Sequence, residues 1–256
     1  MSRRTPSYEE GWEVQYSRGR TPFDLEAPLP WVVTLAEKGR IRGRVLDAGC
    51  GGGHNALYLA GLGYDVVGID VAPSAISRAR HKAEQQGVHA EFAVGDIVNL
   101  ADWPGMFDTV IDIGCFHSLY PADRARYAST LRAACRQGTL LHLRCFTDRK
   151  EKEFAGAGTA AGLSASDLEQ SFADGWDIED LTAVEHDVIP ERGSWSGSWS
   201  TGRSEGMPDD RNRHQETWPG DGPKRAPSMR PIQGTQVFAS EPNMAEFWYA
   251  TMARRP

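Results

Sequence analysis

Short apolar runs alternate with stretches of helical spacing along most of the chain. The short runs predict strands, because each one is bounded by glycine, proline or charged residues and is too short for a helix. A regular alternation of strands and helices is typical of an α/β protein with a mostly parallel sheet and helices on both faces. The predicted strands are 45–48, 64–69, 90–94, 107–113, 140–146, 176–189 and 246–252.

Apolar residues spaced three and four apart predict the helices between these strands. Pro73 and Ser74 open one helix and Gly87 ends it, as expected of a helix start and a C-terminal glycine. Ser166 with Glu169 predicts a capping box for a short helix that ends near Ala173. Other predicted helices carry Trp31, Val32, Leu35 and Ala36; Ala56, Leu57, Leu59 and Ala60; and Tyr127, Leu131, Ala134 and Cys135.

A glycine-rich turn follows the first strand and leads at once into a helix. Gly49, Gly51 and Gly53 can adopt dihedral angles that other residues avoid, so a ligand could lie against bare backbone at the helix start. The dinucleotide fingerprint G-x-G-x-x-G would need a third glycine at the position of His54, and only its looser form ending in Ala56 remains. The turn therefore predicts a nucleotide-like ligand at the carboxyl ends of the strands.

Two further acids stand at the ends of neighbouring strands. Asp70 ends the second strand, where a carboxylate suits the two hydroxyls of a ribose. Asp96 follows the third strand, and by itself an acid there is as readily a turn or N-cap residue. Their order along the chain after Asp47 favours a shared ligand site.

The run D-x-G-x-G-x-G from Asp47 to Gly53 resembles motif I of the class I S-adenosylmethionine-dependent methyltransferases. The resemblance implies a Rossmann-like, seven-stranded, mostly parallel sheet, with S-adenosyl-L-methionine as cofactor and S-adenosyl-L-homocysteine as its product. In that family the acid after the third strand accepts from the adenine amino group, and the next apolar residue packs on the ring. The cofactor residues so implied are Asp47, Gly49, Gly51, Gly53, Asp70, Val71, Asp96, Ile97 and Asp112.

The segment before the first strand carries the pattern W-E-x-x-Y-x-x-G-x-x-P-F-D, from Trp12 to Asp24. It resembles the N-terminal segment of thiopurine and halide/thiol methyltransferase-like enzymes, although Phe23 stands where that pattern often has tryptophan. The resemblance implies a cap, residues 1–40, over the cofactor and acceptor site of a core that spans 41–256. A helix that merely covers the sheet edge is the alternative.

The loop after the fourth strand is expected to border the transferred methyl group, because ligands of open parallel sheets bind beyond the strands' carboxyl ends. We expect His117 on this loop to be a general base or an orienting hydrogen-bond partner, with Tyr16 as a second catalytic residue. A purely structural histidine is the alternative, and an activated acceptor needs no base. The residues expected in the acceptor pocket are Trp12, Phe23, Cys115, Phe116, Trp195 and Trp199.

Residues 191–235 interrupt the pattern before the last strand. The stretch is rich in glycine, serine, proline and charge, so it cannot bury a core of its own. Loops of this length are either functional lids or disordered linkers. Trp195, Trp199 and Trp218 favour a lid slightly, because large apolar rings need a partner.

Charge and composition narrow the possible partners. A formal net charge of −7 argues against a nucleic-acid substrate, which usually calls for a basic face. No apolar run approaches the ~18 residues of a membrane span, and the start has no apolar signal region, so we expect a cytoplasmic protein without a membrane partner. The four cysteines are widely spaced and predict no metal site.

Together these features predict an enzyme that methylates a free small molecule. The D/N-P-P-Y/F run typical of methylation of nucleic-acid bases is missing after the fourth strand, and an aromatic or heteroaromatic acceptor would suit the many aromatic residues. Three alternatives stay open: an enzyme that uses the same cofactor for another reaction such as cyclisation, a nonenzymatic module that senses the cofactor, and a nicotinamide-dependent oxidoreductase. The acceptor, its methylated atom and the oligomeric state stay open too.

Overall fold

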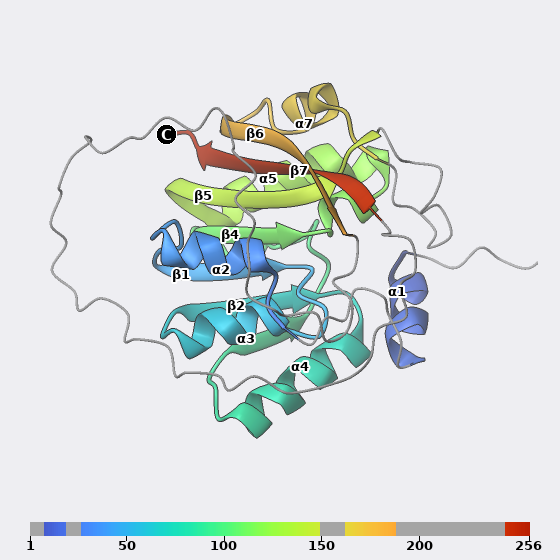
Figure 1. The fold of residues 1–256 in the computed structure, drawn as a ribbon, viewed down its shortest axis with the longest axis vertical. Helices are drawn as coiled ribbons and strands as arrows, with labels where there is room; N and C mark the ends of the chain where they lie inside the picture. Colours follow the sequence, from blue (N-terminus) through green and yellow to red (C-terminus); the bar gives the residue numbers. More distant parts are fainter. Residues whose placement is uncertain (1–7, 19–26, 149–161, 188–243) are drawn as a thin grey trace, which may run out of the picture.

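A single seven-stranded sheet forms the centre of the molecule in the computed structural model, which describes residues 8–18, 27–148, 162–187 and 244–256 (Figure 1). The strand order is β3-β2-β1-β4-β5-β7-β6, parallel throughout except that β7 runs antiparallel to both β5 and β6. The predicted Rossmann-like fold is confirmed. The strands are β1 Arg44–Ala48, β2 Asp65–Asp70, β3 Glu91–Val94, β4 Phe107–Ile113, β5 Cys135–Phe146, β6 Trp176–Asp187 and β7 Met244–Arg254.

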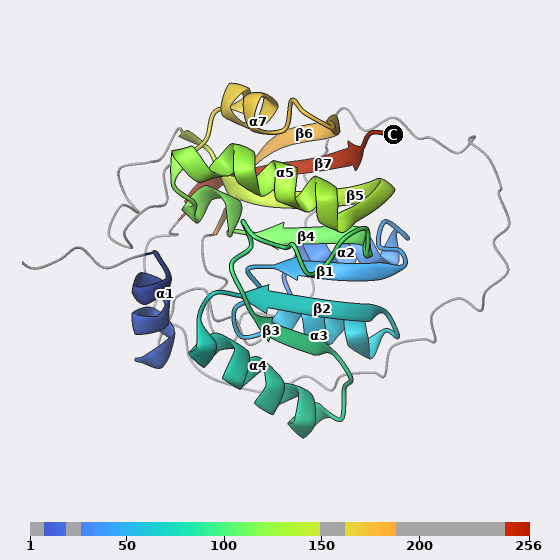
Figure 2. The same cartoon turned by 180° about the vertical axis from the view of Figure 1, so that it is seen from behind.

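Helices cover both faces of the sheet. α2 and α3 lie in front of it in Figure 1, and α5 lies in front in the opposite view of Figure 2. α1 stands apart, beyond the carboxyl ends of β1 and β2, in both views. The helices are α1 Tyr8–Ser17, α2 Pro30–Glu37, α3 His54–Gly61, α4 Pro73–Gln86, α5 Arg124–Ala134 and α7 Ala165–Ser171, with short 3-10 turns at Phe116–Ser118 and Pro121–Asp123.

The central strands are buried on both faces, which explains their continuous apolar character. Successive side chains of a strand point to opposite faces. Val45 accordingly packs in the cluster that contains Val32 of α2, whereas Leu46 packs in the cluster that contains Tyr127 of α5. These two clusters make up most of the core. No helix in the described part of the chain combines the length and the apolar character that crossing a membrane requires.

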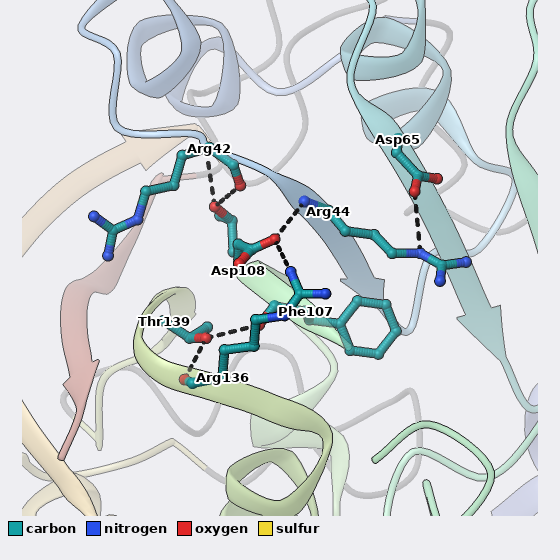
Figure 3. Close-up of polar contacts among 8 residues, drawn as sticks. Arg42, Arg44, Asp65, Phe107, Asp108, Arg136 and Thr139 are labelled. Atoms are coloured by element: carbon teal, nitrogen blue, oxygen red, sulfur yellow. Dashed lines mark hydrogen bonds and ion pairs between the residues drawn. The ribbon is translucent and has the colours of Figure 1, made fainter. Parts of the chain in front are cut away.

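Polar contacts tie together the amino ends of β1 and β4 and the start of β5, opposite the carboxyl ends (Figure 3). The carboxylate of Asp108 accepts from the main-chain N–H of Arg44 over 2.8 Å and pairs with Arg136. Thr109 exchanges hydrogen bonds of 3.0 and 2.8 Å with the main chain of Arg42. The amino ends of these strands are thus closed by their own side chains, and the carboxyl ends remain for a ligand.

Most strand bounds agree with the prediction to within two residues, and two larger differences concern β5 and α7. β5 begins at Cys135, which we predicted to be helical, and five residues before Leu140. Cys135 pairs with Phe107 ahead of a register shift, so the chain passes directly from α5 into the sheet. The capping box is formed by Ser164 and Asp167 rather than by Ser166 and Glu169.

The capping geometry explains the second difference. The Ser164 hydroxyl accepts from the Asp167 N–H over 3.1 Å, and the Asp167 carboxylate accepts from the Ser164 N–H over 2.8 Å. Asp therefore takes the position that Glu or Gln usually fills, and the helix starts two residues earlier.

The two helices of the predicted cap, residues 1–40, lie in different places. α1 lies at the rim, while α2 packs on the sheet with Val32 and Leu35 buried. The predicted insertion 191–235 lies outside the described residues, as do the last two residues of the strand predicted at 176–189.

Candidate active site

A cavity opens at the carboxyl ends of the parallel strands and extends from β3 to β7. Its first part, here called the glycine half, lies over β1, β2 and β3. The second part, here called the β5 half, lies over β4, β5 and the start of β7. The glycine half is lined by Gly49, Ile69, Asp70, Val71, Gly95, Asp96 and Ile97, the β5 half by Ile113, Gly114, Cys115, His117, Ser118, Arg144, Phe146 and Phe247, and the wall beside both by Trp12, Tyr16 and Leu29.

The glycine turn is shaped by close packing as well as by its backbone. Gly49 and Gly51 have φ angles of 69° and 52°, which side chains rarely adopt. A Cβ atom at Gly49 would lie 2.6 Å from the Cβ of Cys115, and one at Gly51 would meet the Tyr16 hydroxyl. Gly53 packs against Ala79 of α4. Only Gly49 of the three lines the cavity, so the other two keep the turn close to its neighbours.

Asp70 joins the end of β2 to this turn. Its carboxylate accepts from the N–H of Gly51 over 2.8 Å and from the N–H of Ala72 over 2.9 Å. The side chain is buried, and desolvation raises its pKa. Since Asp70 also lines the cavity, it holds the turn while facing the place where a ribose is expected.

Two other carboxylates lie behind the cavity. Asp47 accepts from the N–H of Ala56 over 3.1 Å at the start of α3. Asp112 accepts from the N–H groups of Cys115 and Phe116 over 2.9 and 3.0 Å, and from the Tyr127 hydroxyl over 2.5 Å. Burial raises the pKa of each to about 7. Neither side chain lines the cavity, so both position loops that do.

Asp96 and Ile97 close the outer end of the glycine half. The Asp96 carboxylate accepts from the N–H of Val98 over 3.1 Å, the turn contact that an acid after a strand often makes. Ile97 is 5% exposed and packs with the core, while one side of it lines the cavity. The pair thus presents a carboxylate and an apolar surface side by side.

α1 is fastened at two points to the first turns of α4. The Glu13 carboxylate accepts from the N–H of Ser74 over 3.0 Å and from its hydroxyl over 2.5 Å, at the positive end of α4. Arg78 donates to the main-chain carbonyl of Tyr16 near the end of α1. These contacts hold Trp12 and Tyr16 against the cavity. The sequence analysis missed them, although the start of α4 at Pro73 was a usable signal.

His117 lies in the β5 half, 5% exposed, on the 3-10 turn after β4. Its Nδ1 accepts from the main-chain N–H of Phe146 over 3.3 Å. Desolvation, with smaller contributions from Arg144 and Arg124, lowers the pKa of the imidazolium to about 3. The ring is therefore neutral near pH 7, with its proton on Nε2.

The aromatic wall of the β5 half comes from neighbouring strands. The rings of Phe146 and Phe247 are stacked with centroids 4.6 Å apart, and the His117 ring centroid is also 4.6 Å from that of Phe146. Arg144 lies over Phe247. The sequence analysis missed these three residues; the only signal for Arg144 was a charge within an otherwise apolar strand.

Comparison with known proteins identifies the family of this chain. The family described as a methyltransferase domain matches residues 45–138. An uncharacterized methyltransferase of Schizosaccharomyces pombe is 40% identical over 122 residues, which are 48% of this chain and 84% of that protein. The chain belongs to the S-adenosylmethionine-dependent methyltransferases.

Other relatives resemble this methyltransferase over different lengths. The 2-heptyl-1-hydroxyquinolin-4(1H)-one methyltransferase of Mycobacteroides abscessus is 38% identical over 143 residues, 52% of this chain and 63% of that protein. One solved structure is 31% identical, with a TM-score of 0.69 over 96% of this chain and 92% of that chain. It was solved for the conversion of a disulfide bond into a thioacetal group during echinomycin biosynthesis. The family predicted from motif I is confirmed.

The residues predicted for the acceptor pocket and for catalysis divide into three groups. Trp12, Cys115 and His117 line the cavity, as does Tyr16. Phe116 does not: it is 0% exposed and packs between Tyr127 and Phe172, with ring centroids 5.2 and 5.1 Å away. That prediction was wrong, because the 3-10 turn directs this ring into the core. Phe23, Trp195 and Trp199 lie outside the described residues.

The direct cofactor contact predicted for Asp112 is not favoured by its position. The carboxylate is fully enclosed by the main-chain N–H groups of its own loop and by Tyr127. Within the described ranges, no group of three or more His, Cys, Asp and Glu side chains could hold a metal ion.

Proposed function

We propose that the methyltransferase transfers its methyl group to a small molecule with a conjugated ring, at an oxygen or sulfur atom, in the β5 half of the cavity. One observation carries the proposal: the glycine half and the aromatic β5 half form one continuous cavity. A cofactor held over β1 to β3 would place its reactive end next to the ring surfaces of Phe146 and Phe247.

The residues of the glycine half fit S-adenosylmethionine. Gly49 presents bare backbone at the turn, and Asp70 lines the part of the cavity where a ribose is expected. Asp96 offers a hydrogen-bond acceptor for the adenine amino group, and Ile97 offers an apolar surface for the adenine ring. When bound, the cofactor supplies a methyl group on a sulfonium, which is a good leaving group. The protein therefore has to align the acceptor and exclude water rather than to activate the donor.

The chain's own residues supply that alignment. Trp12 and Tyr16 cover the cavity from α1, and Phe146 and Phe247 contribute an apolar surface to its wall. The Nε2–H of His117 is a hydrogen-bond donor at the edge of that surface. Each of these groups orients the acceptor, and none of them has to accept a proton.

The names of relatives support an oxygen or sulfur acceptor. One relative methylates a hydroxyquinolinone, and others in Arabidopsis thaliana are named a probable thiol methyltransferase, 29% identical, and a thiocyanate methyltransferase, 29% identical. The similar structure described under disulfide conversion adds a sulfur-containing compound. The alternative of cyclisation with the same cofactor is not favoured by these names.

The test is product analysis with the full-length protein. S-adenosylmethionine is incubated with hydroxyquinolinones, aromatic thiols, thiocyanate or no acceptor, and both S-adenosylhomocysteine and the mass of the acceptor are measured. We expect S-adenosylhomocysteine formation that depends on an acceptor, and a mass gain of one methyl group on that acceptor. Release of methylthioadenosine without an acceptor would instead show cyclisation, and an unchanged donor with every acceptor would overturn the proposal.

A further inference from the structure

Arg144 is a cation in the β5 half of the cavity, and it has no role in the reaction as proposed above. It lies near the carboxyl end of β5, paired in register with Ile113 of β4 and Tyr249 of β7. Its Nε donates to the Tyr249 hydroxyl over 3.0 Å, and its guanidinium carbon lies 3.5 Å from the ring centroid of Phe247. These two contacts fix the guanidinium group in one orientation.

The positive charge of Arg144 is not balanced within the described part of the chain. No carboxylate there lies within ion-pair distance of it, and its two terminal nitrogens make no hydrogen bond. Desolvation is the main cause that lowers its pKa. A partly buried cation without an anionic partner is costly, which indicates that a ligand supplies the anion.

The groups that surround Arg144 do not offer a negative charge near pH 7. They are the His117 imidazole from the turn after β4, the Tyr249 phenol from β7 and the neighbouring Cys145 thiol, with Arg124 of α5 beyond His117. Burial raises the pKa of Tyr249 and that of Cys145, so both stay neutral near pH 7. The cavity's acids, Asp70 and Asp96, stand at β2 and β3.

The sheet keeps these acids away from Arg144. β1 and β4 lie between β2 and β5, so three strand spacings, about 14 Å, separate the ends of β2 and β5. At that distance a carboxylate does not pair with a guanidinium group. The two halves of the cavity therefore differ in charge: acidic around the cofactor and basic around the acceptor.

We propose that Arg144 is a specificity-determining residue that binds the acceptor as an anion. The inference rests on the proposed function, because the anion is the deprotonated oxygen or sulfur nucleophile. Planar guanidinium groups suit such oxygen and sulfur anions, and the Nε2–H of His117 is a second donor in the same half of the cavity. The acceptor class is thus phenol-like, N-hydroxy or thiol compounds that ionise near neutral pH.

The bond changes balance without a protein base. The acceptor releases its proton to solvent before transfer, and Arg144 favours the ionised form. A lone pair of the anion then forms the bond to the methyl carbon while the bond from that carbon to the sulfonium sulfur breaks, and the sulfur keeps the electron pair. A neutral His117 and a cationic Arg144 are both unchanged at the end.

The cofactor's own carboxylate is a second possible source of the anion, and the position of Arg144 argues against it. The glycine turn begins at the end of β1, while Arg144 is two strands away on β5, beside the aromatic surface. An experiment has to separate the two sources. Affinity for S-adenosylhomocysteine reports the cofactor carboxylate, and affinity for an added anion reports the acceptor.

The test is calorimetric binding to the full-length protein saturated with S-adenosylhomocysteine, so that no turnover occurs. The probes are thiophenol at about pH 8, where it is ionised; thioanisole, its neutral methylated form; and thiocyanate, an anion without a ring. The variants are Arg144→Met, Arg144→Lys and, as control, Arg136→Met, which removes an exposed charge from the opposite end of the same strand.

We expect wild type and Arg136→Met to bind thiophenolate more tightly than thioanisole. Arg144→Met should weaken thiophenolate and thiocyanate by about 10- to 100-fold, the range for a hydrogen bond to a charged group, and leave thioanisole nearly unchanged. Arg144→Lys should retain part of the preference. The affinity for S-adenosylhomocysteine should not change in any variant, which also shows that each of them is folded.

Three results would overturn the inference. They are equal binding of thiophenolate and thioanisole by wild type, a full anion preference in Arg144→Met, and a loss of S-adenosylhomocysteine affinity in Arg144→Met and Arg144→Lys alike, which would assign Arg144 to the cofactor. The proposed function fails separately, through the turnover assay. A protein that binds anions at Arg144 yet methylates none of the acceptors would keep this site and lose only the reaction.

Discussion

The main-chain N–H of Phe146 donates to Nδ1 of His117 over 3.3 Å. This contact decides the role of the histidine, because a nitrogen that accepts a hydrogen bond cannot carry the proton of a neutral ring. The proton is on Nε2, where a general base would need a lone pair. Of the two roles predicted for His117, the structure therefore favours the orienting donor over the base.

Two substitutions separate the functions of the two ring nitrogens. His117→Asn keeps an oxygen near the position of Nδ1 for the N–H of Phe146, and His117→Gln places an amide donor near the position of Nε2. We expect Gln to retain more turnover than Asn, with a loss of about tenfold or less. Between about pH 6 and 9, both variants should show the wild-type pH profile in shape, because the pKa of His117 is lowered to about 3.

A general base would give a different pattern. Turnover in both variants would then fall by roughly 10²- to 10⁴-fold, and the wild-type profile would lose a titration step on mutation. Steady-state rates measured at saturating cofactor distinguish the two patterns. S-adenosylhomocysteine affinity, measured in parallel, identifies any variant whose site has collapsed.

Gly51 is a position where both dihedral strain and contact exclude a side chain. Its φ angle is 52°, and a Cβ atom would meet the Tyr16 hydroxyl. Gly51→Ala should weaken S-adenosylhomocysteine binding by about tenfold or more, because α1 must move away from the turn. Gly87→Ala is the control, since Gly87 has a φ of 62° at the end of α4 and nothing within 4 Å of the added Cβ.

The contact and the strain at Gly51 can be separated. The double variant Gly51→Ala/Tyr16→Phe removes the hydroxyl while the strained φ remains, so it should recover part of the lost affinity relative to Gly51→Ala. Equal affinities of the single and double variants in calorimetry would show that α1 does not cover the turn as described.

Asp112 should make the methyltransferase less stable as the pH rises. Burial raises its pKa to about 7, so between about pH 4 and 7 the native state holds a proton that the unfolded chain releases. The stabilisation is complete below the ordinary pKa and is lost as the pH rises through 7. Asp112→Asn cannot ionise, so its free energy of unfolding should fall less over this range, by on the order of 1–3 kcal/mol.

Urea unfolding of wild type and variant at about pH 5 and 8 measures this difference. Asp174→Asn is the control, because it removes an exposed carboxylate of an ion pair with Arg132. Burial also raises the pKa of Asp47 to about 7, so part of the slope should remain in Asp112→Asn. Parallel slopes in wild type and Asp112→Asn would show that Asp112 stays ionised in the native state.

The strand and helix pattern of the fold could be predicted because the sequence is locally consistent. β4 has the bounds predicted from its apolar run, and α4 begins at Pro73 and ends just before Gly87, where the φ angle is 62°. The start of β5 could not be predicted from periodicity. Cys135 continues the helical spacing of α5, and only its pairing with Phe107 across the sheet draws it into a strand.

Within the site, sequence order predicted which loops meet but not where each side chain points. Asp70 and Asp96 follow neighbouring parallel strands, so their shared cavity follows from topology. Phe116 and His117 are adjacent on one loop, yet the first enters the core and the second lines the cavity. Arg144 was missed because its role depends on Tyr249 and Phe247, about 100 residues later.

The last prediction concerns Asp70, whose carboxylate holds the glycine turn and faces the expected ribose. Asp70→Asn keeps one oxygen, which can still accept from the N–H of Ala72, but its amide nitrogen cannot accept from the N–H of Gly51. We expect affinity for S-adenosylhomocysteine to fall by about 10- to 100-fold, because a buried donor loses its partner and the ribose loses a charged acceptor. Asp65→Asn, at the exposed start of the same strand, is the matched control and should bind like wild type.

Calorimetry with adenosine as a second ligand separates the lost contact of Asp70 with the ribose from its lost hydrogen bond to the N–H of Gly51. A carboxylate that binds the ribose predicts weaker binding of adenosine as well as of S-adenosylhomocysteine, whereas an unchanged affinity for both ligands would mean that the cofactor does not lie over β2.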